Sequence, residues 1–152
     1  MRLLIVPMLL AALCGIARAD GEQIYNNNCI ICHQPDANGV PGMYPPLADS
    51  ISRYVAIPAG RAYLVHVVSF GMTGPISAHG QTYDGVMQPW SLLEDQEVAD
   101  VLNYVLTTFN AKLLPKNFKP LTAEEVKKGR AAGASMSDVH TERAALLKAL
   151  AK

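Results

Sequence analysis

Two cysteines and a histidine stand close together in this sequence, in the run Cys29-Ile30-Ile31-Cys32-His33. On a helical turn the two cysteines occupy positions i and i+3, so both sulfur atoms emerge on one face. Two thiols on one face can form thioethers to the two vinyl groups of a single haem, and the next residue, His33, can bind the iron. The pattern therefore predicts covalent attachment of one haem c, with His33 as the proximal ligand.

Other chemistry that a C-x-x-C pair can perform explains these residues less well. A structural disulfide between Cys29 and Cys32 would leave His33 without a role. A thioredoxin-like redox motif is expected near a βαβ pattern, which this sequence lacks. A zinc site needs further cysteine or histidine ligands at matching spacing, and the sequence offers none. Haem attachment is the favoured interpretation.

The second axial ligand of the iron must come from elsewhere in the chain. The candidates are Met43, Met72, Met87, Met136, His66, His79 and His140. A lone methionine usually fills a core, and this is how we interpret Met43 and Met72, although Met72 lies between two glycines and is the second choice as a ligand. His66 is expected to be a packed or surface histidine rather than a ligand. His79 lies closer to the expected haem edge but is not favoured as a ligand either.

Three segments carry a resemblance to the class I c-type cytochromes, and in particular to a bacterial subgroup of them. They are Tyr25-x-x-x-Cys29-x-x-Cys32-His33, Val40-Pro41-Gly42-Met43-Tyr44-Pro45-Pro46-Leu47-Ala48-Asp49-Ser50 and Gly80-Gln81-Thr82-Tyr83-Asp84-Gly85-Val86-Met87-Gln88-Pro89-Trp90. The resemblance covers about residues 20–110. It implies an all-α class I cytochrome c fold around one covalently bound haem, with Met87 as the distal iron ligand.

The local sequence around Met87 agrees with that role. Gly85 and Pro89 supply turn chemistry that can hold the thioether on a loop facing the haem, and Trp90 can cover the edge of the macrocycle. A thioether ligand also suits reversible electron transfer. The chain departs from the resembled family at Gln88, where that family usually has proline.

The resemblance also assigns two residues of the proline-rich segment. It implies that the backbone carbonyl of Pro45 accepts a hydrogen bond from Nδ1–H of His33, which would turn Nε2 toward the iron. It further implies that Leu47 packs on the face of the haem.

Three helices are expected between residues 20 and 112. The first runs from about Gly21 to Cys32 behind an Asp20 cap, and in the resembled fold it crosses the last helix near Tyr104. That last helix opens with a predicted capping box, Ser91-x-x-Glu94, and continues with Val98, Val101, Leu102, Val105 and Phe109 at helical spacing. The valine-rich residues 61–70 could form a strand by propensity, but the resemblance favours a helix ending at Gly71.

Residues 1–19 read as a secretory signal peptide that is cleaved after Ala19. A positive start, an apolar stretch from Leu3 to Ile16 and the small residues of Ala17-Arg18-Ala19 fit that interpretation. The apolar stretch is shorter than the ~20 residues that span a bilayer, so we expect no stable membrane span after cleavage. Leu13 before Cys14 argues against lipidation. The sequence thus predicts export to the bacterial periplasm.

Residues 113–152 form a basic extension to the cytochrome domain expected at 20–112. Helices are expected from the Thr122-x-x-Glu125 capping box to about Ala132 and from Ser137 to Ala151, with Val139, Ala145, Leu146 and Leu150 available for burial. Residues 20–112 have a net charge of −6 and the extension +4, so we expect the extension to lie across the acidic core. The alternatives are a frayed tail and a tail that binds a partner.

The amino-acid composition excludes two classes of protein. Half of the residues are hydrophobic, and Lys+Arg equals Asp+Glu, which excludes a disordered chain and leaves no basic footprint for nucleic acid. The favoured function is a periplasmic monohaem carrier of single electrons, not an enzyme. A haem enzyme or gas sensor, and a purely structural subunit, are the alternatives.

The redox partner is expected to be another periplasmic protein. The resembled subgroup serves as the haem subunit, or the acceptor, of dehydrogenases for sulfite, alcohols or sugars, and also occurs fused to copper nitrite reductases. This chain is accordingly expected to link a dehydrogenase or reductase with the respiratory chain, and a haem subunit of a sulfite dehydrogenase is one such role.

Overall fold

The computed structural model describes residues 20–151, and the predicted signal peptide lies outside them. The helices are α1 (Gly21–Asn28), α2 (Ile30–His33), α3 (Pro58–Phe70), α4 (Asp95–Phe109), α5 (Ala123–Ala132) and α6 (Met136–Leu150). Two 3₁₀ turns, η1 (Ser52–Ala56) and η2 (Ala111–Leu113), and two strands, β1 (Met72–Ala78) and β2 (Gln81–Met87), complete the order. None of the helices in this part of the chain is long and apolar enough to cross a membrane.

The N-terminal helix is interrupted at Cys29, so the prediction of one continuous helix to Cys32 is wrong. The Asp20 cap is present, with its Oδ1 accepting from Gln23 N at 2.9 Å. The Cys29 N–H still donates to the Tyr25 carbonyl, and Cys29 then caps the short helix α2. His33 N donates to the Cys29 carbonyl at 2.9 Å. The break therefore leaves Cys29, Cys32 and His33 together on one helical turn.

Helices α1 and α4 cross at close range, as predicted. A Cβ atom on Gly21 would lie 2.2 Å from the Asp100 carbonyl oxygen and 2.7 Å from Tyr104 Cβ, so only glycine fits there. Beside this contact the buried Tyr25 ring packs on Tyr104 and Phe109, with centroids 5.7 and 5.4 Å away. The crossing anchors the chain just before the cysteine pair.

The cap of α4 differs from the prediction by three residues. Its N-cap is Glu94, whose backbone N–H donates to Glu97 Oε2 at 2.7 Å, so the capping box begins at Glu94 and the predicted Ser91 box is wrong. Leu92 and Leu93 separate Ser91 from the helix. The predicted apolar face is buried, with Val98, Val101, Leu102 and Val105 at most 5% exposed.

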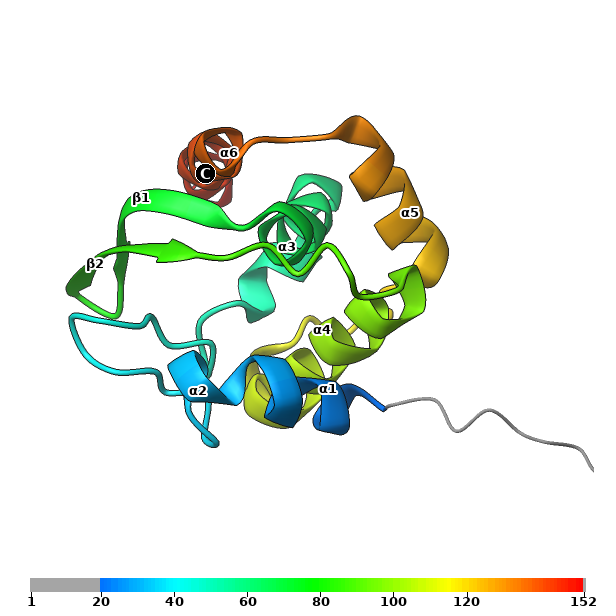
Figure 1. The fold of residues 1–152 in the computed structure, drawn as a ribbon, viewed down its shortest axis with the longest axis horizontal. Coiled ribbons are helices and arrows are strands. Elements are labelled where there is room, and N and C mark those ends of the chain that lie inside the picture. Colours follow the sequence, from blue (N-terminus) through cyan, green and yellow to red (C-terminus); the bar gives the residue numbers. More distant parts are fainter. Residues whose placement is uncertain (1–19, 152) are drawn as a thin grey trace, which may run out of the picture.

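Residues 58–70 are helical, which confirms α3, and its end leads into an unpredicted β-hairpin. Gly71, at φ +74°, ends the helix. Strands β1 and β2 pair antiparallel around His79 and Gly80, whose φ values of +48° and +75° suit a two-residue hairpin turn. The fold is thus mostly helical as expected, with one small sheet beside α3 (Figure 1).

The extension folds as two helices that pack on the rest of the molecule. Thr122 and Glu125 form the predicted capping box, and α5 lies against α3 and α4, whereas α6 lies against α3 and β1 (Figure 1). Leu121, Val126, Val139 and Leu146 are at most 4% exposed. The frayed-tail alternative is therefore wrong. One predicted burial is also wrong, because Ala145 is exposed and Arg143 lies on the buried face instead.

Ion pairs between the extension and residues 20–112 contribute to this packing. In one pair the positive charge is on the extension, and in the other it is on α3. Arg130 of α5 pairs with Asp95 at 2.8 Å, which is the predicted sense, basic extension to acidic core. Arg61 of α3 pairs with Glu125 of α5 at 2.7 Å, which is the reverse sense. The charge difference between the segments therefore explains only part of the contact, and the buried apolar side chains explain the rest.

Candidate functional site

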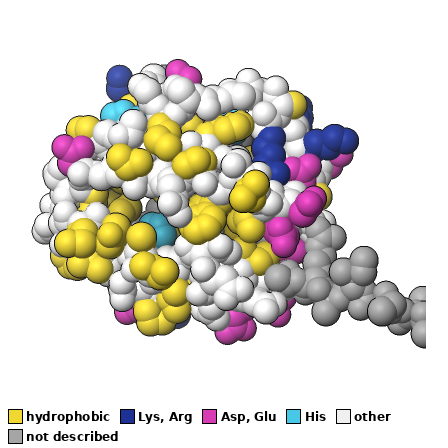
Figure 2. All heavy atoms as spheres, viewed as in Figure 1, with side chains coloured by type: hydrophobic (Ala, Val, Ile, Leu, Met, Phe, Trp, Pro, Cys, Tyr) yellow, Lys and Arg dark blue, Asp and Glu magenta, His cyan; other side chains and the backbone are white. Residues whose placement is uncertain are grey.

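A cavity of about 640 Å³ lies between α2, the loop before η1, α3, the hairpin and α4. Its lining is largely aliphatic and includes Leu64, Val67, Val68, Leu93, Val101, Leu102 and Val105. Hydrophobic side chains also gather around a hollow on the face shown in Figure 2. A cavity of this volume and lining suits a large apolar ligand.

Most of the predicted site residues line this cavity. Those that do are Cys29, His33, Pro45, Leu47, Met87 and Trp90. Cys32 is half-buried one helical turn from Cys29 and is not among the lining residues. Both cysteines are free thiols, so the alternative of a disulfide between them is not realised.

A hydrogen bond to the Pro45 backbone fixes the orientation of the His33 ring. Its Nδ1 lies 3.0 Å from the Pro45 carbonyl oxygen, the pairing that the resemblance implies. A carbonyl oxygen only accepts, so Nδ1 must carry the proton, and in the neutral ring Nε2 then keeps a lone pair. Burial lowers the pKa of His33, against the opposing effect of the Pro45 bond, which favours that neutral ring. His33 is thereby prepared to donate a nitrogen lone pair.

Burial also affects the protonation of the Cys29 thiol. Burial first, and the neighbouring Cys32 second, raise the pKa of Cys29 to about 11. In this fold the sulfur is consequently a neutral thiol at neutral pH. Such a thiol is protected from the oxidation that thiolates undergo.

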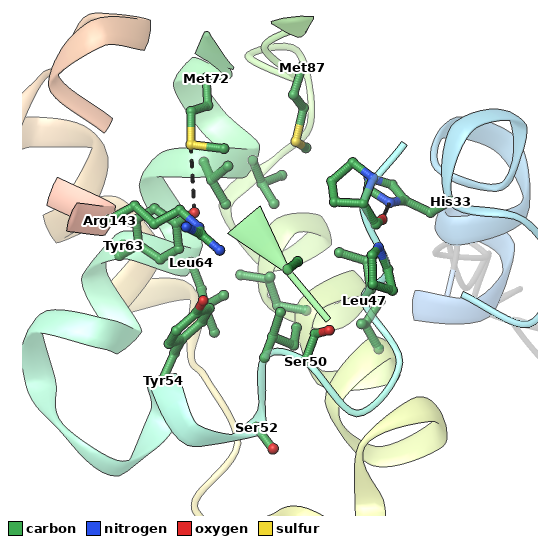
Figure 3. Close-up of a pocket in the computed structure, with 18 of the residues that line it drawn as sticks. His33, Leu47, Ser50, Ser52, Tyr54, Tyr63, Leu64, Met72, Met87 and Arg143 are labelled. Carbon is green, nitrogen blue, oxygen red and sulfur yellow. Dashed lines mark hydrogen bonds between the residues drawn. The ribbon is translucent and has the colours of Figure 1, made fainter. Parts of the chain in front are cut away.

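Two methionines enter the cavity from the hairpin. Met87 is the last residue of strand β2 and Gly85 lies within that strand, so the prediction that Met87 stands on a loop is wrong. Met72 and Met87 are directly opposite each other in the β1–β2 register, and their sulfur atoms point toward the cavity (Figure 3). The Tyr63 hydroxyl donates to Met72 Sδ at 3.7 Å, so one lone pair of that sulfur is already engaged. Within residues 20–151 no such bond to the Met87 sulfur is found. This difference favours Met87 as the available thioether.

The other ligand candidates are placed elsewhere or are otherwise engaged. Met43 is 60% exposed, so its interpretation as core filler is wrong. His66 is buried between the core and the extension, with Nδ1 2.8 Å from Glu142 Oε2. His140 Nε2 lies 2.8 Å from the Pro75 carbonyl oxygen. His79 lines the cavity, but its Nε2 lies 2.9 Å from Ser50 Oγ.

Tyr63 and Arg143 are among the polar residues of the cavity that sequence reasoning missed. Tyr63 is on α3 and Arg143 is on α6, and both line the cavity (Figure 3). The available signal for Arg143 was its spacing, because it stands four residues after Val139 and three before Leu146 on the buried face of α6.

The residues of the cavity fit a covalently bound haem. A thiol at one edge can form a thioether, a neutral imidazole and a thioether sulfur are both ligands that haem iron accepts, and the aliphatic walls suit the macrocycle. The chemistry of this donor set agrees with the pattern from which the site was predicted.

Comparison with known proteins gives a consistent result. A protein-family model for cytochrome c matches residues 18–109. A cytochrome c-552 of Thermus thermophilus is 42% identical over 142 residues, covering 93% of this chain and 95% of the relative. That matched stretch is long enough that it must include most of the residues after Phe109. The cytochrome c subunit of a quinone alcohol dehydrogenase of Gluconobacter oxydans is 34% identical over 121 residues, covering 77% of this chain but only 23% of the relative.

Proposed function

Because the chain belongs to the cytochrome c family, we propose that it is a periplasmic monohaem cytochrome that carries single electrons. Cytochromes of this family bind haem c covalently. The observation that supports the proposal most directly is that a neutral-imidazole nitrogen and a thioether sulfur, His33 and Met87, line one apolar cavity next to Cys29.

Each site residue has a specific role in this proposal. Cys29 and Cys32 would form the two thioethers to the haem, and His33 and Met87 would bind its iron. The haem, when bound, supplies reversible exchange of one electron between ferric and ferrous iron. Leu47 and Trp90 exclude water from it as part of the cavity wall.

The Pro45 carbonyl contributes through His33. A hydrogen bond to Nδ1 holds the ring in one tautomer and one orientation and makes Nε2 a stronger donor. A ring held in this way needs no reorientation when the iron changes oxidation state. Such rigidity favours electron transfer.

The presence of two protein ligands for the iron would also argue for a carrier rather than a haem enzyme or gas sensor. An enzyme that activates peroxide or oxygen needs an open iron position, whereas His33 and Met87 would fill both axial positions. The relatives are electron-carrying cytochromes, including a dehydrogenase subunit, in line with this view.

We further propose the cellular setting from the sequence. The predicted signal peptide directs the chain to the periplasm, where it takes electrons from a dehydrogenase, or gives them to a reductase, in exchange with the respiratory chain. Service as the haem subunit of a dehydrogenase, such as one for sulfite, is the more specific form. The similarity to part of an alcohol dehydrogenase subunit supports this kind of partner.

The proposal is tested by producing the full chain in a bacterium that matures c-type cytochromes. We expect the protein in the periplasmic fraction, haem staining that survives denaturation, the weak far-red absorption band of methionine-ligated ferric haem, and uptake of one electron per chain in a dithionite titration. The Cys29→Ala/Cys32→Ala variant is the control and should not stain. Full staining of that control, or a chain that takes up no electron, would contradict the proposal.

A further inference from the structure

The buried face of α6 carries one residue that does not suit an apolar contact. Val139 and Leu146, on either side of Arg143 along that face, are 0% and 4% exposed. Arg143 is itself only 8% exposed. Burying a guanidinium is costly unless a partner compensates its charge, whereas a leucine there would complete the face at no such cost. Packing alone therefore does not explain an arginine at this position.

Its contacts within the chain leave most of that charge uncompensated. Nη2 donates to the Ser77 carbonyl oxygen of β1 at 2.8 Å. Among the residues that the structure describes, no carboxylate lies within ion-pair distance of Arg143, although Arg61 and Arg130 each have one. A guanidinium has five N–H donors, and a single carbonyl engages few of them. An anionic partner from outside the chain would accept hydrogen bonds from the remaining N–H donors and compensate the charge.

Arg143 lines the same cavity as the proposed haem ligands. Figure 3 shows it beside Tyr63, across the cavity from His33 and Leu47. Burial raises the pKa of Tyr63, and the charge of Arg143 acts against that rise, so the two groups lie close enough to interact. The other ionisable groups that line the cavity are Cys29, His33, Asp49, Arg53, Tyr54 and His79. Glu142, on the same helix as Arg143, binds His66.

We propose, on the basis of the haem function above, that Arg143 binds a carboxylate of the haem and raises its reduction potential. Haem is an apolar ring with two propionate side chains, and this cavity is an apolar pocket with one buried cation. A propionate charge stabilises ferric iron, so a cation that neutralises it favours the ferrous state. Arg143 lies outside the residues that the family model matches, 18–109. The extension thereby becomes part of the redox site.

The test compares matched variants of the full haem-bound chain. Arg143→Gln removes the charge from the cavity, Lys148→Gln removes an exposed charge from the same helix, and Arg130→Gln removes the ion pair to Asp95 that helps to hold the extension. Haem staining and the far-red band are measured first, so that failure of the haem function is recognised separately. The reduction potential is then measured from about pH 5 to about pH 8, across the range in which a propionate without a partner is expected to titrate.

We expect only Arg143→Gln to lower the potential, and to lower it more at the alkaline end than at the acid end, because an unpaired propionate becomes protonated as the pH falls. The groups named above are common to all variants, so their protonation does not produce this difference. A stained Arg143→Gln protein with the wild-type potential at every pH overturns the proposal. If Arg143→Gln yields no haem protein, Arg143→Lys decides. Holoprotein with a potential near wild type supports the role of charge, and a Lys variant that also fails overturns it.

Discussion

At the scale of single residues, one hydrogen bond distinguishes the two methionines of the site. Met72 and Met87 are cross-strand partners with the same side chain on the same face of the hairpin. The Tyr63 hydroxyl, donating to Met72 Sδ at 3.7 Å, fixes that sulfur against α3. The resemblance and the residues around Met87 already favoured it over Met72, but the Tyr63 contact could not be predicted, because it depends on a tyrosine on another element.

Substitution of Met87 tests this assignment. Met87→His should keep a six-coordinate haem but lose the far-red band and lower the reduction potential, since imidazole donates more strongly than a thioether. The matched control is Met72→Leu, a volume-conserving change at the paired position, which should keep the band. Absorption spectra and redox titration measure both effects. If the control loses the band and Met87→His keeps it, Met72 is the ligand.

At the scale of elements, helices with a local sequence signal were predictable and the hairpin was not. The Asp20 and Thr122 caps and the apolar spacing of α4 are properties of neighbouring residues. The hairpin contains Gly74, Pro75 and Gly85, which weaken strand propensity, and β1 packs on α6, a contact between segments far apart in the sequence. The interruption at Cys29 also has no local signal, because residues 26–33 contain neither glycine nor proline.

The apolar contact of α6 yields the next prediction. Leu146→Ala should lower the free energy of unfolding by about 2 to 5 kcal/mol, because it leaves a cavity at a site that is almost fully buried. Leu92→Ala, at a side chain that is 98% exposed, is the control and should change it by less than about 0.5 kcal/mol. Both are measured by chemical denaturation of the haem-bound protein. Equal effects of the two substitutions would show that α6 does not dock in solution.

The Arg61–Glu125 pair adds a pH dependence to the docking of α5. Arg61 Nε and Nη2 donate to the two carboxylate oxygens of Glu125 at 2.7 and 2.9 Å, and this bond lowers the pKa of Glu125 below its ordinary value of 4.5. A carboxyl whose pKa is lower in the folded state stabilises that state above its unfolded pKa and loses the contribution as the pH falls through the folded pKa.

The melting temperature of wild type should therefore exceed that of Glu125→Gln near neutral pH, and the difference should shrink steadily below pH 4.5. The side chain is partly exposed, so the difference is expected to be small and to decrease with added salt. Glu124→Gln, on the same helical turn, is the matched control. A pH-independent difference would assign the effect to the capping of α5 by Thr122 instead.

At the scale of the whole molecule, the sequence predicted the site residues that are neighbours in the chain better than those that come from distant segments. Cys29, Cys32 and His33 are adjacent in the chain, so their chemistry follows from spacing alone. Arg143 is more than one hundred residues away, and it reaches the cavity because α6 packs across α3 and β1. Such a contact is a property of the tertiary arrangement. The extension was predicted to dock through its charge and its apolar side chains, and its packing brings Arg143 to the wall of the cavity.

The size of the cavity makes the haem part of the hydrophobic core. Protein interiors contain few voids larger than a water molecule. At ~24 cal/mol per Å³, a cavity of about 640 Å³ without its ligand would cost roughly 15 kcal/mol, an upper bound because water can enter part of it. Even a fraction of that bound is comparable with the ~5–15 kcal/mol by which whole domains are stable. The native packing of the walls should not survive without the haem.

We therefore predict that the haem-free chain lacks the native fold. The Cys29→Ala/Cys32→Ala variant should show reduced helical circular dichroism and no cooperative thermal transition, because the helices α3 and α4 lose the surface on which they pack. Residues 20–152 with both cysteines intact, produced in the cytoplasm where haem is not attached, are the control for the substitutions and should behave in the same way. Covalent attachment then stabilises the fold as well as retaining the haem, since it prevents the equilibrium loss of a group that contributes this much of the core. A haem-free chain that melts cooperatively near the temperature of the haem-bound protein would contradict this argument and would mean that the walls close on themselves.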